Sequence, residues 1–438
     1  MIDKGLSSWG RYPAFPQLGQ PIYWLDGVPR ALADMNTALP VLAYGCGRSY
    51  GDTCMAVSDR VLAMRGVNRL ISADWNTGLI VAEAGLTLAE LIRIALPRGW
   101  FLNVTPGTKF VTVGGAVAND VHGKNHHVTG TFGCHIHRLT LHRTVEGTVT
   151  ASRDERPDLF AATVGGLGLT GVILTVELQL RRVTSADVEQ CSTRFGGLDD
   201  FFDLSDTHDR EYEYTVAWID CVATGKKSGR GFFVTGKHCR TGNLAAERSD
   251  AWRFPIDPGV SLVNPITVRA FNSLYYRRQL RRKVVHRIGY DAFFYPLDRV
   301  LMWNRIYGRA GFQQYQCVVP KSCGREVIRA ALDEISRSGA GSFLAVLKQC
   351  GAQPSPGLMS FPMHGVSLAL DFPQRAEVNR RLFAKLDELV HEAGGRLYPA
   401  KDAHMSAAHF QKAYPAWQRV EALRDPRLMS RFWQRVTQ

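Results

Sequence analysis

The stretches VLAYGCGRSYGD, at residues 41–52, and VTVGGAVANDVHGKNHH, at residues 111–127, decide how this chain is interpreted. Each is a short apolar run that ends in a glycine-rich turn crowded with polar residues. Glycine lets the backbone take positive φ and approach a ligand closely, which leaves main-chain N–H groups free to hold phosphate oxygens. Two such turns indicate one large phosphate-bearing cofactor that is held at two points.

The composition is that of an ordinary globular protein with room for two or three domains. The 438 residues are 45% hydrophobic and 21% charged. No apolar run of about eighteen residues predicts a transmembrane helix, and the N-terminal stretch lacks the apolar region of a secretory signal. The nine cysteines are scattered without a CxxC pair, which favours free thiols in a reducing cytoplasm. We therefore expect a cytoplasmic protein.

The net charge of +13 leaves a basic soluble enzyme and an anionic partner as open interpretations. The stretch RAFNSLYYRRQLRRKVVHR, at residues 269–287, carries seven Lys or Arg, no acidic residue and three interleaved aromatic residues. This mixture suits an anionic lipid interface and predicts peripheral contact with the inner face of the membrane, although a solvated helix face explains it equally well. Nucleic-acid binding is not expected, because no helix-turn-helix, zinc-finger or RNP-like pattern accompanies the charge.

Local patterns predict an α+β fold. The first 180 or so residues alternate strand-like runs with glycine turns and one helix, whose Thr87 and Glu90 form a capping-box pattern. After residue 184 aromatic-rich strands alternate with amphipathic helices. Strands are expected at 60–64, 79–84, 137–142, 171–179, 214–223, 312–320, 341–348 and 366–372, and helices at 86–96, 326–338 and 376–393. We predict a cofactor domain at 1–183, a substrate-binding cap with a mostly antiparallel sheet at 184–395, and a segment at 396–438 that returns to the cofactor domain.

Two common nucleotide motifs do not fit the first turn. Gly45, Gly47 and Gly51 occupy relative positions 1, 3 and 7, whereas a Rossmann fingerprint needs positions 1, 3 and 6 and a helix directly afterwards. No GxxxxGK[ST] sequence occurs, so a P-loop is excluded.

The run HGKNHH, at residues 122–127, is the strongest candidate for a metal site, because it holds three histidines. His126 and His127 are adjacent, so their side chains point apart and rarely share an ion. No carboxylate or cysteine at ligand spacing completes a set, and no metal is expected.

The two glycine turns, with PGT at 106–108 and VGGLGLTGV at 164–172, resemble flavoproteins of the vanillyl-alcohol-oxidase type, which have a two-part PCMH-type FAD-binding domain. Within that superfamily the chain resembles the decaprenylphosphoryl-β-D-ribose 2-oxidase family. The likeness begins at Trp9-Gly10-Arg11 and runs in order over nearly the whole chain. It includes GRSYGD, PGTKFVTVGGAVANDVHGKNHH, TFGCHI, VGGLGLTG, YTVAWID, YPLDRVLMWNRIYGRAGFQQYQ, MSFP, ALDFP and GGRLYPAKD.

The resemblance implies an FAD-dependent oxidoreductase that converts a sugar hydroxyl to a ketone by hydride transfer to flavin N5. In that family the substrate is a polyprenyl-phosphate pentose, oxidised at the ribose 2-carbon. A short-chain reductase partner then gives the arabinose epimer, for arabinose biosynthesis in the cell envelope. An oxidase or dehydrogenase of a soluble polyol or aldonolactone is the alternative function, and a non-catalytic sugar-phosphate or lipid-binding module is a third.

The resemblance also implies which residues contact FAD. We expect the cofactor to be non-covalent, since the turn Gly47-Arg48-Ser49-Tyr50 lacks the histidine through which some relatives attach it. The expected contacts are Gly45, Cys46, Gly47, Arg48, Ser49, Tyr50, Gly51, Asp52, Gly107, Thr108, Thr112, Gly114, Gly115, Asn119, His122, Gly123, Asn125, Ile173 and Tyr398.

Lys401, in LYPAKD, is the predicted catalytic residue. A cation beside the substrate oxygen would stabilise the developing alkoxide, and a buried lysine with a lowered pKa could also accept the proton. Ala369 and Phe294 depart from the family, which has cysteine and tyrosine there, so substrate identity is less certain than fold. The substrate contacts implied by the resemblance are Lys124, Trp218, Phe294, Gln314, Gln316, Lys348 and Ala369.

Overall fold

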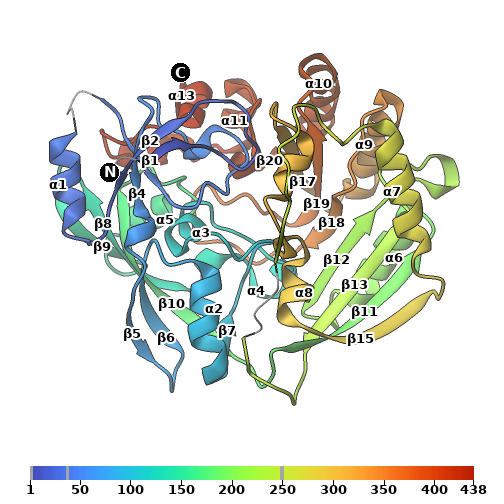
Figure 1. Cartoon of the computed structure of the whole chain (residues 1–438), viewed down its shortest axis with the longest axis horizontal. Helices are drawn as coiled ribbons and strands as arrows, with labels where there is room; N and C mark the ends of the chain where they lie inside the picture. The colour runs from blue at the N-terminus through green and yellow to red at the C-terminus, as the bar shows by residue number, and fades with distance from the viewer. Residues whose placement is uncertain (1–2, 36–38, 247–250) are drawn as a thin grey trace.

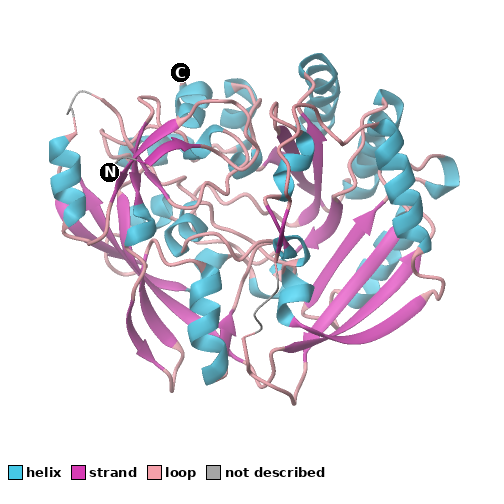
Figure 2. Ribbon diagram, viewed as in Figure 1, coloured by secondary structure: helices cyan, strands magenta, loops and turns pink. Residues whose placement is uncertain are grey.

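The strands form three large sheets that helices pack against (Figures 1 and 2). The computed structural model describes residues 3–35, 39–246 and 251–438. Most neighbouring strands in these residues run antiparallel, and the predicted α+β class is confirmed. Among the described helices, none has the length and apolar character needed to span a bilayer.

The N-terminal sheet carries the first glycine turn. Its strand order is β1-β2-β4-β3, and β4 runs parallel to both of its neighbours. The turn at residues 45–51 follows β3 directly, so this sheet fixes where the turn begins. The strands are β1 (Asp3–Leu6), β2 (Gln17–Pro21), β3 (Leu42–Tyr44) and β4 (Arg60–Ala63).

The second sheet carries helix α2 (Leu88–Ala95), whose start follows the predicted capping box. The Glu90 N–H donates to Thr87 Oγ1 (3.2 Å), and the Thr87 N–H donates to the Glu90 carboxylate (2.8 Å). The helix ends at Ala95, because Pro97 follows within a 3₁₀ turn. The strand order is β5-β6-β10-β8-β9, with β7 also on β10. The strands are β5 (Leu70–Asp74), β6 (Leu79–Glu83), β7 (Trp100–Leu102), β8 (Ile136–Arg143), β9 (Gly147–Ser152) and β10 (Val172–Arg182).

The third sheet is antiparallel throughout and has the order β15-β11-β13-β12-β18-β19-β17-β20. One face is apolar and packs against α6 (Leu198–His208), α9 (Gly324–Ser338) and α10 (Ala376–Glu392). At one end of the other face lies α7 (Pro265–Arg277), whose Tyr275 ring is 4.6 Å from that of Trp218 (Figure 1). The strands are β11 (Asp187–Phe195), β12 (Tyr214–Ile219), β13 (Gly231–His238), β15 (Lys283–Gly289), β17 (Phe312–Pro320), β18 (Ala345–Cys350), β19 (Gly365–Pro373) and β20 (Arg396–Leu397).

Some predicted bounds differ in the structure, and the strand expected at 214–223 already ends at Ile219. The strand expected at 341–348 begins only at Ala345, because Ser342 Oγ accepts a hydrogen bond from the Leu344 N–H and forms a turn there. The basic aromatic stretch at 269–287 is not one helix. It comprises the second half of α7 and the edge strand β15, and the link between them contains Leu280.

The C-terminal segment lies against the N-terminal sheet (Figure 1). Leu428 forms a bridge with Val41, and Ser430 forms one with Ala56. Its helices are α11 (Ala407–Ala413), α12 (Trp417–Leu423) and α13 (Arg431–Thr437). The remaining elements are α1 (Gly27–Asp34), α3 (Val113–Ala118), α4 (His126–Thr129), α5 (Pro157–Thr163), α8 (Tyr290–Phe294), β14 (Trp252–Arg253), β16 (Val300–Leu301), and the 3₁₀ turns η1 (Asp52–Cys54), η2 (Met64–Gly66), η3 (Leu96–Arg98), η4 (Phe132–His135), η5 (Gly225–Lys227), η6 (Pro296–Arg299), η7 (Trp303–Tyr307) and η8 (Pro399–Lys401).

Candidate active site

The structure brings the two glycine turns together. A Cβ atom added to Gly45 would lie 2.5 Å from the Thr112 hydroxyl, at the start of α3. One added to Gly51 would lie 1.7 Å from the carbonyl oxygen of Asp402, next to Lys401. Only glycine permits both approaches. Three segments far apart in sequence, at 45–52, 107–125 and 398–402, therefore meet at one place.

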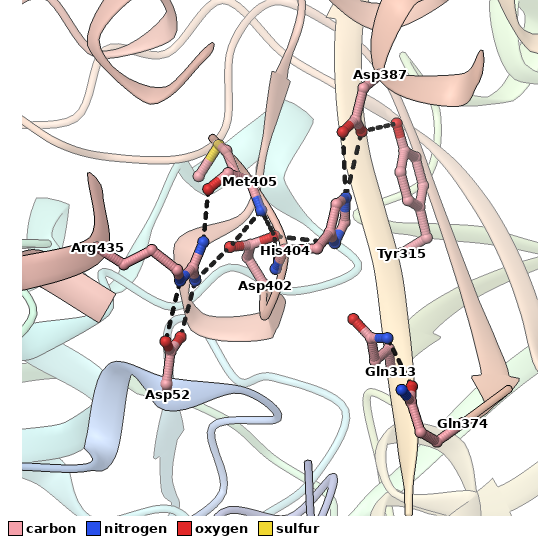
Figure 3. A network of polar contacts seen from close by, with 9 residues as sticks. All are labelled: Asp52, Gln313, Tyr315, Gln374, Asp387, Asp402, His404, Met405 and Arg435. Carbon is pink, nitrogen blue, oxygen red and sulfur yellow. Dashed lines mark hydrogen bonds and ion pairs between the residues drawn. The ribbon is translucent and has the colours of Figure 1, made fainter. Parts of the chain in front are cut away.

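Arg435 of α13 ties the first turn to the Lys401 segment (Figure 3). Its guanidinium forms a bidentate ion pair with Asp52, at 2.9 and 3.1 Å, and another with Asp402 at 2.9 Å. It also donates to the carbonyl of Met405 at 2.5 Å. The Asp52 carboxylate is thus occupied by its ion pair with Arg435, so only the main chain of Asp52 is left for the predicted cofactor contact.

His404 extends this network towards the third sheet (Figure 3). Its Nε2 atom lies 3.3 Å from the carboxylate of Asp387 in α10, and that carboxylate accepts a hydrogen bond from Tyr315 in β17 at 3.0 Å. In the same view Gln313 donates to Gln374 at 2.7 Å. Burial lowers the pKa of His404, but Asp402 and Asp387 outweigh it and raise that pKa overall. The segment around Lys401 is therefore anchored on both sides.

Lys401 is half-buried at the end of η8, and its ammonium lies 3.5 Å from the centre of the Tyr50 ring. Burial lowers the pKa of Lys401 to about 7, with Arg48 acting in the same direction and Asp371 opposing it. The structure thus places the predicted catalytic lysine beside the first glycine turn, where a poised amine can stabilise or accept charge.

A second buried lysine holds His122. Lys348, on β18, lies 2.5 Å from His122 Nδ1 and donates to the carbonyl of Gly123 at 2.8 Å. The other ring nitrogen of His122, Nε2, lies 3.3 Å from the side-chain amide nitrogen of Gln316. Burial, reinforced by Lys348, lowers the pKa of His122 well below its usual range.

Lys124, in the second glycine-rich stretch, is partly buried. Its ammonium donates to the carbonyl of Phe293 and lies 4.5 Å from the centre of that ring. Burial lowers the pKa of Lys124 to about 7. The Phe294 ring lies behind it in an aromatic core, stacked 5.4 Å from Phe101. With 2% of its surface exposed, Phe294 is a core residue, and its predicted contact with substrate stays a prediction.

The sheet register places most predicted substrate residues on one face. Trp218 is opposite Val346, Val346 is opposite Ala369, and Ala369 is opposite Gln316. Directly opposed residues and residues two apart on a strand share a face, so Gln314 and Lys348 belong to it as well. Trp218 donates through Nε1 to the Phe343 carbonyl at 2.8 Å and so sits at the α7 end of this face. The polar face of the third sheet therefore looks towards the glycine turns.

Several predicted cofactor residues shape the loops by bonding to the protein itself. Thr112 caps α3 by accepting from Gly115 (3.1 Å), and Asn119 donates to the Gly115 carbonyl (2.8 Å). Tyr398 donates to the Asn119 carbonyl (2.9 Å), which brings its ring to 5.5 Å from His122. Among the other predicted residues, Thr108 accepts a hydrogen bond from the Phe110 N–H, and Asn125 donates one to the Asn103 carbonyl. Gly114 packs against Ala84, and Ile173 of β10 lies in the core. The first turn contains Cys46, Gly47 and Ser49.

The adjacent histidines contact different partners. His126 accepts from the Gly351 N–H at 3.2 Å, whereas His127 Nε2 lies 3.0 Å from the Tyr212 carbonyl. In the described residues no group of three His, Cys, Asp or Glu side chains is arranged to hold a metal ion.

Comparison with known proteins supplies the family. Residues 26–152 match the model of an FAD binding domain. Decaprenylphosphoryl-beta-D-ribose oxidase of Mycolicibacterium smegmatis is 36% identical over 444 residues, which cover 97% of this chain and 95% of that protein. The chain belongs to the decaprenylphosphoryl-β-D-ribose oxidase family.

Relatives with other names share parts of this oxidase family's sequence. L-gulono-1,4-lactone dehydrogenase of Mycobacterium tuberculosis is 25% identical over 88% of this chain and 86% of its own length. L-gulonolactone oxidase of Mus musculus is 31% identical over 32% of this chain and 31% of its own length. The predictions of an FAD-dependent oxidoreductase and of FAD as its cofactor are confirmed.

Arg48 shows that the first turn of this oxidase family member suits an anionic cofactor. Its guanidinium stacks 4.0 Å from Trp9, and its buried Nε has no hydrogen-bond partner in the described structure. A buried donor without a partner destabilises a protein, and a diphosphate oxygen would satisfy it. Gly107 has open space where a side chain would lie, so a ligand can approach its backbone. Together these features fit the diphosphate of FAD.

Denaturation tests the predicted non-covalent attachment. We expect acid-precipitated protein to leave its yellow colour in the supernatant, because the turn at 47–50 contains no histidine. The measurement is flavin absorbance in the pellet and the supernatant after ultrafiltration. Flavin that stays on the polypeptide would contradict the prediction, and Cys46 or Cys54 would then be examined by mass spectrometry as the attachment site.

Sequence reasoning missed Asp371 and Arg435. Asp371 is an acidic residue in the otherwise apolar strand sequence GVSLALDFP, and its position two residues after Ala369 places it on the polar face. That alternation was a usable signal. Arg435 offered none, because its partners Asp52 and Asp402 lie 383 and 33 positions away.

Proposed function

We propose that this enzyme oxidises a hydroxyl of a pentose carried on a polyprenyl phosphate, most specifically the 2-hydroxyl of ribose. One observation carries the proposal: the polar sheet face that holds Lys348 and Gln316 continues through Trp218 to the exposed helix α7. A sugar at the glycine turns and a lipid at α7 would use both ends of this face. The M. smegmatis relative, whose name specifies a decaprenylphosphoryl ribose, supports the same substrate class.

Lys124 and Lys348 suit the phosphate of such a substrate. Burial lowers the pKa of Lys124 and of Lys348, since neither ammonium has a carboxylate partner among the described residues. A phosphate oxygen would supply the missing negative charge. We therefore assign Lys124 and Lys348 to the phosphate end, and Gln314 and Gln316 to the sugar hydroxyls.

Lys401 is the residue that we place beside the reacting oxygen. Bound FAD supplies the hydride acceptor. A cation next to the substrate oxygen stabilises the negative charge that develops there, and it does so most strongly where water is excluded. The keto sugar formed from ribose would need a reductase to become arabinose. A short-chain reductase partner is therefore part of the proposal.

Anaerobic mixing tests the substrate. Polyprenylphosphoryl-β-D-ribose is expected to bleach the oxidised flavin absorbance of the enzyme, while free ribose and soluble polyols leave it unchanged. L-gulono-1,4-lactone is the essential comparison, because one relative is named for that substrate. Bleaching by the lactone alone would assign a soluble substrate and reject the lipid-linked pentose.

The surface of α7 suits an anionic membrane. Ile266 and Leu274 lie on one stripe of the helix and are 80% and 70% exposed, and Leu280 beyond the helix is 82% exposed. Arg269 and Arg277 are exposed on the same helix. Apolar side chains flanked by arginines bind the interface of acidic bilayers. We propose peripheral contact there, at the inner face of the membrane, with lipid-linked substrate entering past α7.

Vesicle sedimentation tests this contact. The wild-type protein is expected to sediment with phosphatidylglycerol vesicles and to be released by salt, because arginines attract the anionic surface. The double variant Ile266→Glu, Leu274→Glu should lose at least about tenfold in vesicle affinity, since two buried apolar contacts are replaced by repelled charges. Val145→Glu is the matched control, because Val145 is 74% exposed in the other domain. Equal sedimentation of all three proteins would reject the contact.

A further inference from the structure

Asp371 is a buried carboxylate on the polar face of the third sheet, and the functions assigned so far do not use it. It is 1% exposed and lies on β19, opposite Gln314. Gln314 donates to its Oδ1 atom at 2.6 Å. Its Oδ2 atom is buried and has no hydrogen-bond partner in the described structure. One oxygen is therefore fixed in place, and the other is a buried acceptor without a partner.

The groups around Asp371 come from three other elements. Lys401 of η8 interacts electrostatically with it, but the two form no ion pair among the described contacts. Asp371 also acts electrostatically on Tyr50 of the first glycine turn and on Tyr307 of η7, whose buried hydroxyl has no hydrogen-bond partner in the described structure. Asp371 is thus surrounded by two tyrosine hydroxyls and an ammonium that act on it electrostatically.

Burial shifts the pKa values of both Asp371 and Lys401 in the direction that favours the uncharged form. Burial raises the pKa of Asp371 to about 7, while Gln314 and Lys401 oppose that rise. A general base is most efficient when its pKa is near the working pH. Burial raises the pKa of Tyr50 and of Tyr307 well above the usual range, so both phenols stay protonated and cannot serve as the base.

We propose that Oδ2 of Asp371 accepts the proton of the substrate hydroxyl, while Lys401 stays an ammonium and stabilises the oxygen. The inference rests on the proposed function. The O–H bond breaks and its proton bonds to Oδ2. The electron pair left on oxygen forms the second C–O bond, as the same carbon gives up its hydride to the oxidant of this family, FAD. Gln314 is a positioning residue that fixes the carboxylate.

The first test is the pH dependence of flavin reduction by polyprenylphosphoryl-β-D-ribose, measured anaerobically in single turnover. In the wild-type enzyme the rate should rise as Asp371 loses its proton and fall again as Lys401 loses its own, with apparent pKa values that belong to the pair. Asp371→Asn should retain FAD, reduce it at least about a hundredfold more slowly, and lose the acidic limb of the profile. Asp199→Asn, which removes an exposed carboxylate of α6, is the matched control and should behave as wild type.

The second test separates catalysis from structure. Asp371→Ala should regain at least about tenfold in flavin reduction when formate is added, because formate can occupy the vacated space and accept the proton. Asp371→Asn should melt at pH 8 no lower than the wild type. The raised pKa means that the folded protein binds the Asp371 proton more tightly than the unfolded chain does. The stability that this proton gives the folded protein is therefore lost as pH rises through about 7.

A readout without substrate completes the design. Carboxyl ¹³C NMR of the FAD-bound protein should show one aspartate that titrates near neutrality and is absent from Asp371→Asn. A wild-type rate and profile in Asp371→Asn would overturn the proposal, as would loss of FAD or a lower melting temperature in Asp371→Asn. Absence of formate rescue in Asp371→Ala would overturn it too. If the wild-type flavin is reduced only by L-gulono-1,4-lactone, the substrate is wrong. The same variants measured with the lactone then still decide the role of Asp371.

Discussion

Lys401→Met is expected to bind FAD normally and to reduce it about a thousandfold more slowly than the wild type, since removing one preorganised donor to a developing oxyanion has an effect of that order. The lysine ammonium lies against the Tyr50 ring, and methionine has a similar length and fills the same space. The fold and the glycine turns should therefore persist. The measurement is anaerobic loss of oxidised flavin absorbance after mixing with polyprenylphosphoryl-β-D-ribose.

Lys412→Met is the matched control for this prediction. Lys412 lies in α11 of the same C-terminal segment, but its side chain is exposed. Its replacement should leave flavin reduction unchanged. If Lys401→Met retains a rate within about tenfold of the wild type, the lysine has no essential part in the chemical step, because that difference corresponds to only about 1.4 kcal/mol.

Arg435→Met is expected to destabilise the protein by about 3–5 kcal/mol at neutral pH and to release FAD. The change leaves two carboxylates, 3–4% exposed, without their shared cation, and breaking a buried ion pair on one side has an effect of this size. Asp52 ends the first glycine turn and Asp402 follows Lys401, so both sides of the site should loosen. Thermal melting and the FAD dissociation constant measure the two effects.

The loss should shrink as the pH falls. In the wild type, burial raises the pKa of Asp402, but Arg435 and His404 outweigh it and lower that pKa overall. The wild-type contribution of this group is therefore present above the unfolded-state pKa and lost as pH falls through the folded-state pKa. Without Arg435 the buried carboxylates are easier to protonate, so Arg435→Met should approach the wild type in acid.

Arg431→Met, on the same helix, is the control for Arg435→Met. Arg431 pairs with Asp59, whose side chain is 48% exposed, so its loss should change the stability by about 1 kcal/mol or less. Equal destabilisation by the two variants would show that α13 is sensitive to any substitution and that the bidentate pair has no special part.

Local sequence patterns predicted the elements well, because each depends on neighbours along the chain. The capping box at Thr87 and Glu90 gave the start of α2, and the helix predicted to close at Gly394 ends one residue earlier than the expected range, at Glu392. The glycine turns were predicted to approach a ligand closely, and the structure shows that Gly45 also leaves room for the Thr112 side chain. Residues two apart on β17, Gln314 and Gln316, share the predicted face.

Contacts between distant elements could not be read from the sequence. Nothing in the sequence pairs Trp218 of β12 with Val346 of β18, yet that pairing connects the polar face to α7. Nothing local in the sequence showed that α8 packs Phe294 against Phe101 and Tyr214 in an aromatic core. The shifted pKa of Asp371 depends on its burial and on its proximity to Lys401, and no local sequence pattern specifies either.

The pairing of Asp52 with Arg435 joins residues 383 positions apart and so imposes an order on biosynthesis. A ribosome makes the first glycine turn long before the guanidinium that holds it, and contacts of such separation form late in folding. A nascent chain that lacks α13 should therefore have an incompletely folded nucleotide-binding region. The vitamin-derived cofactor should bind only after that helix has been translated.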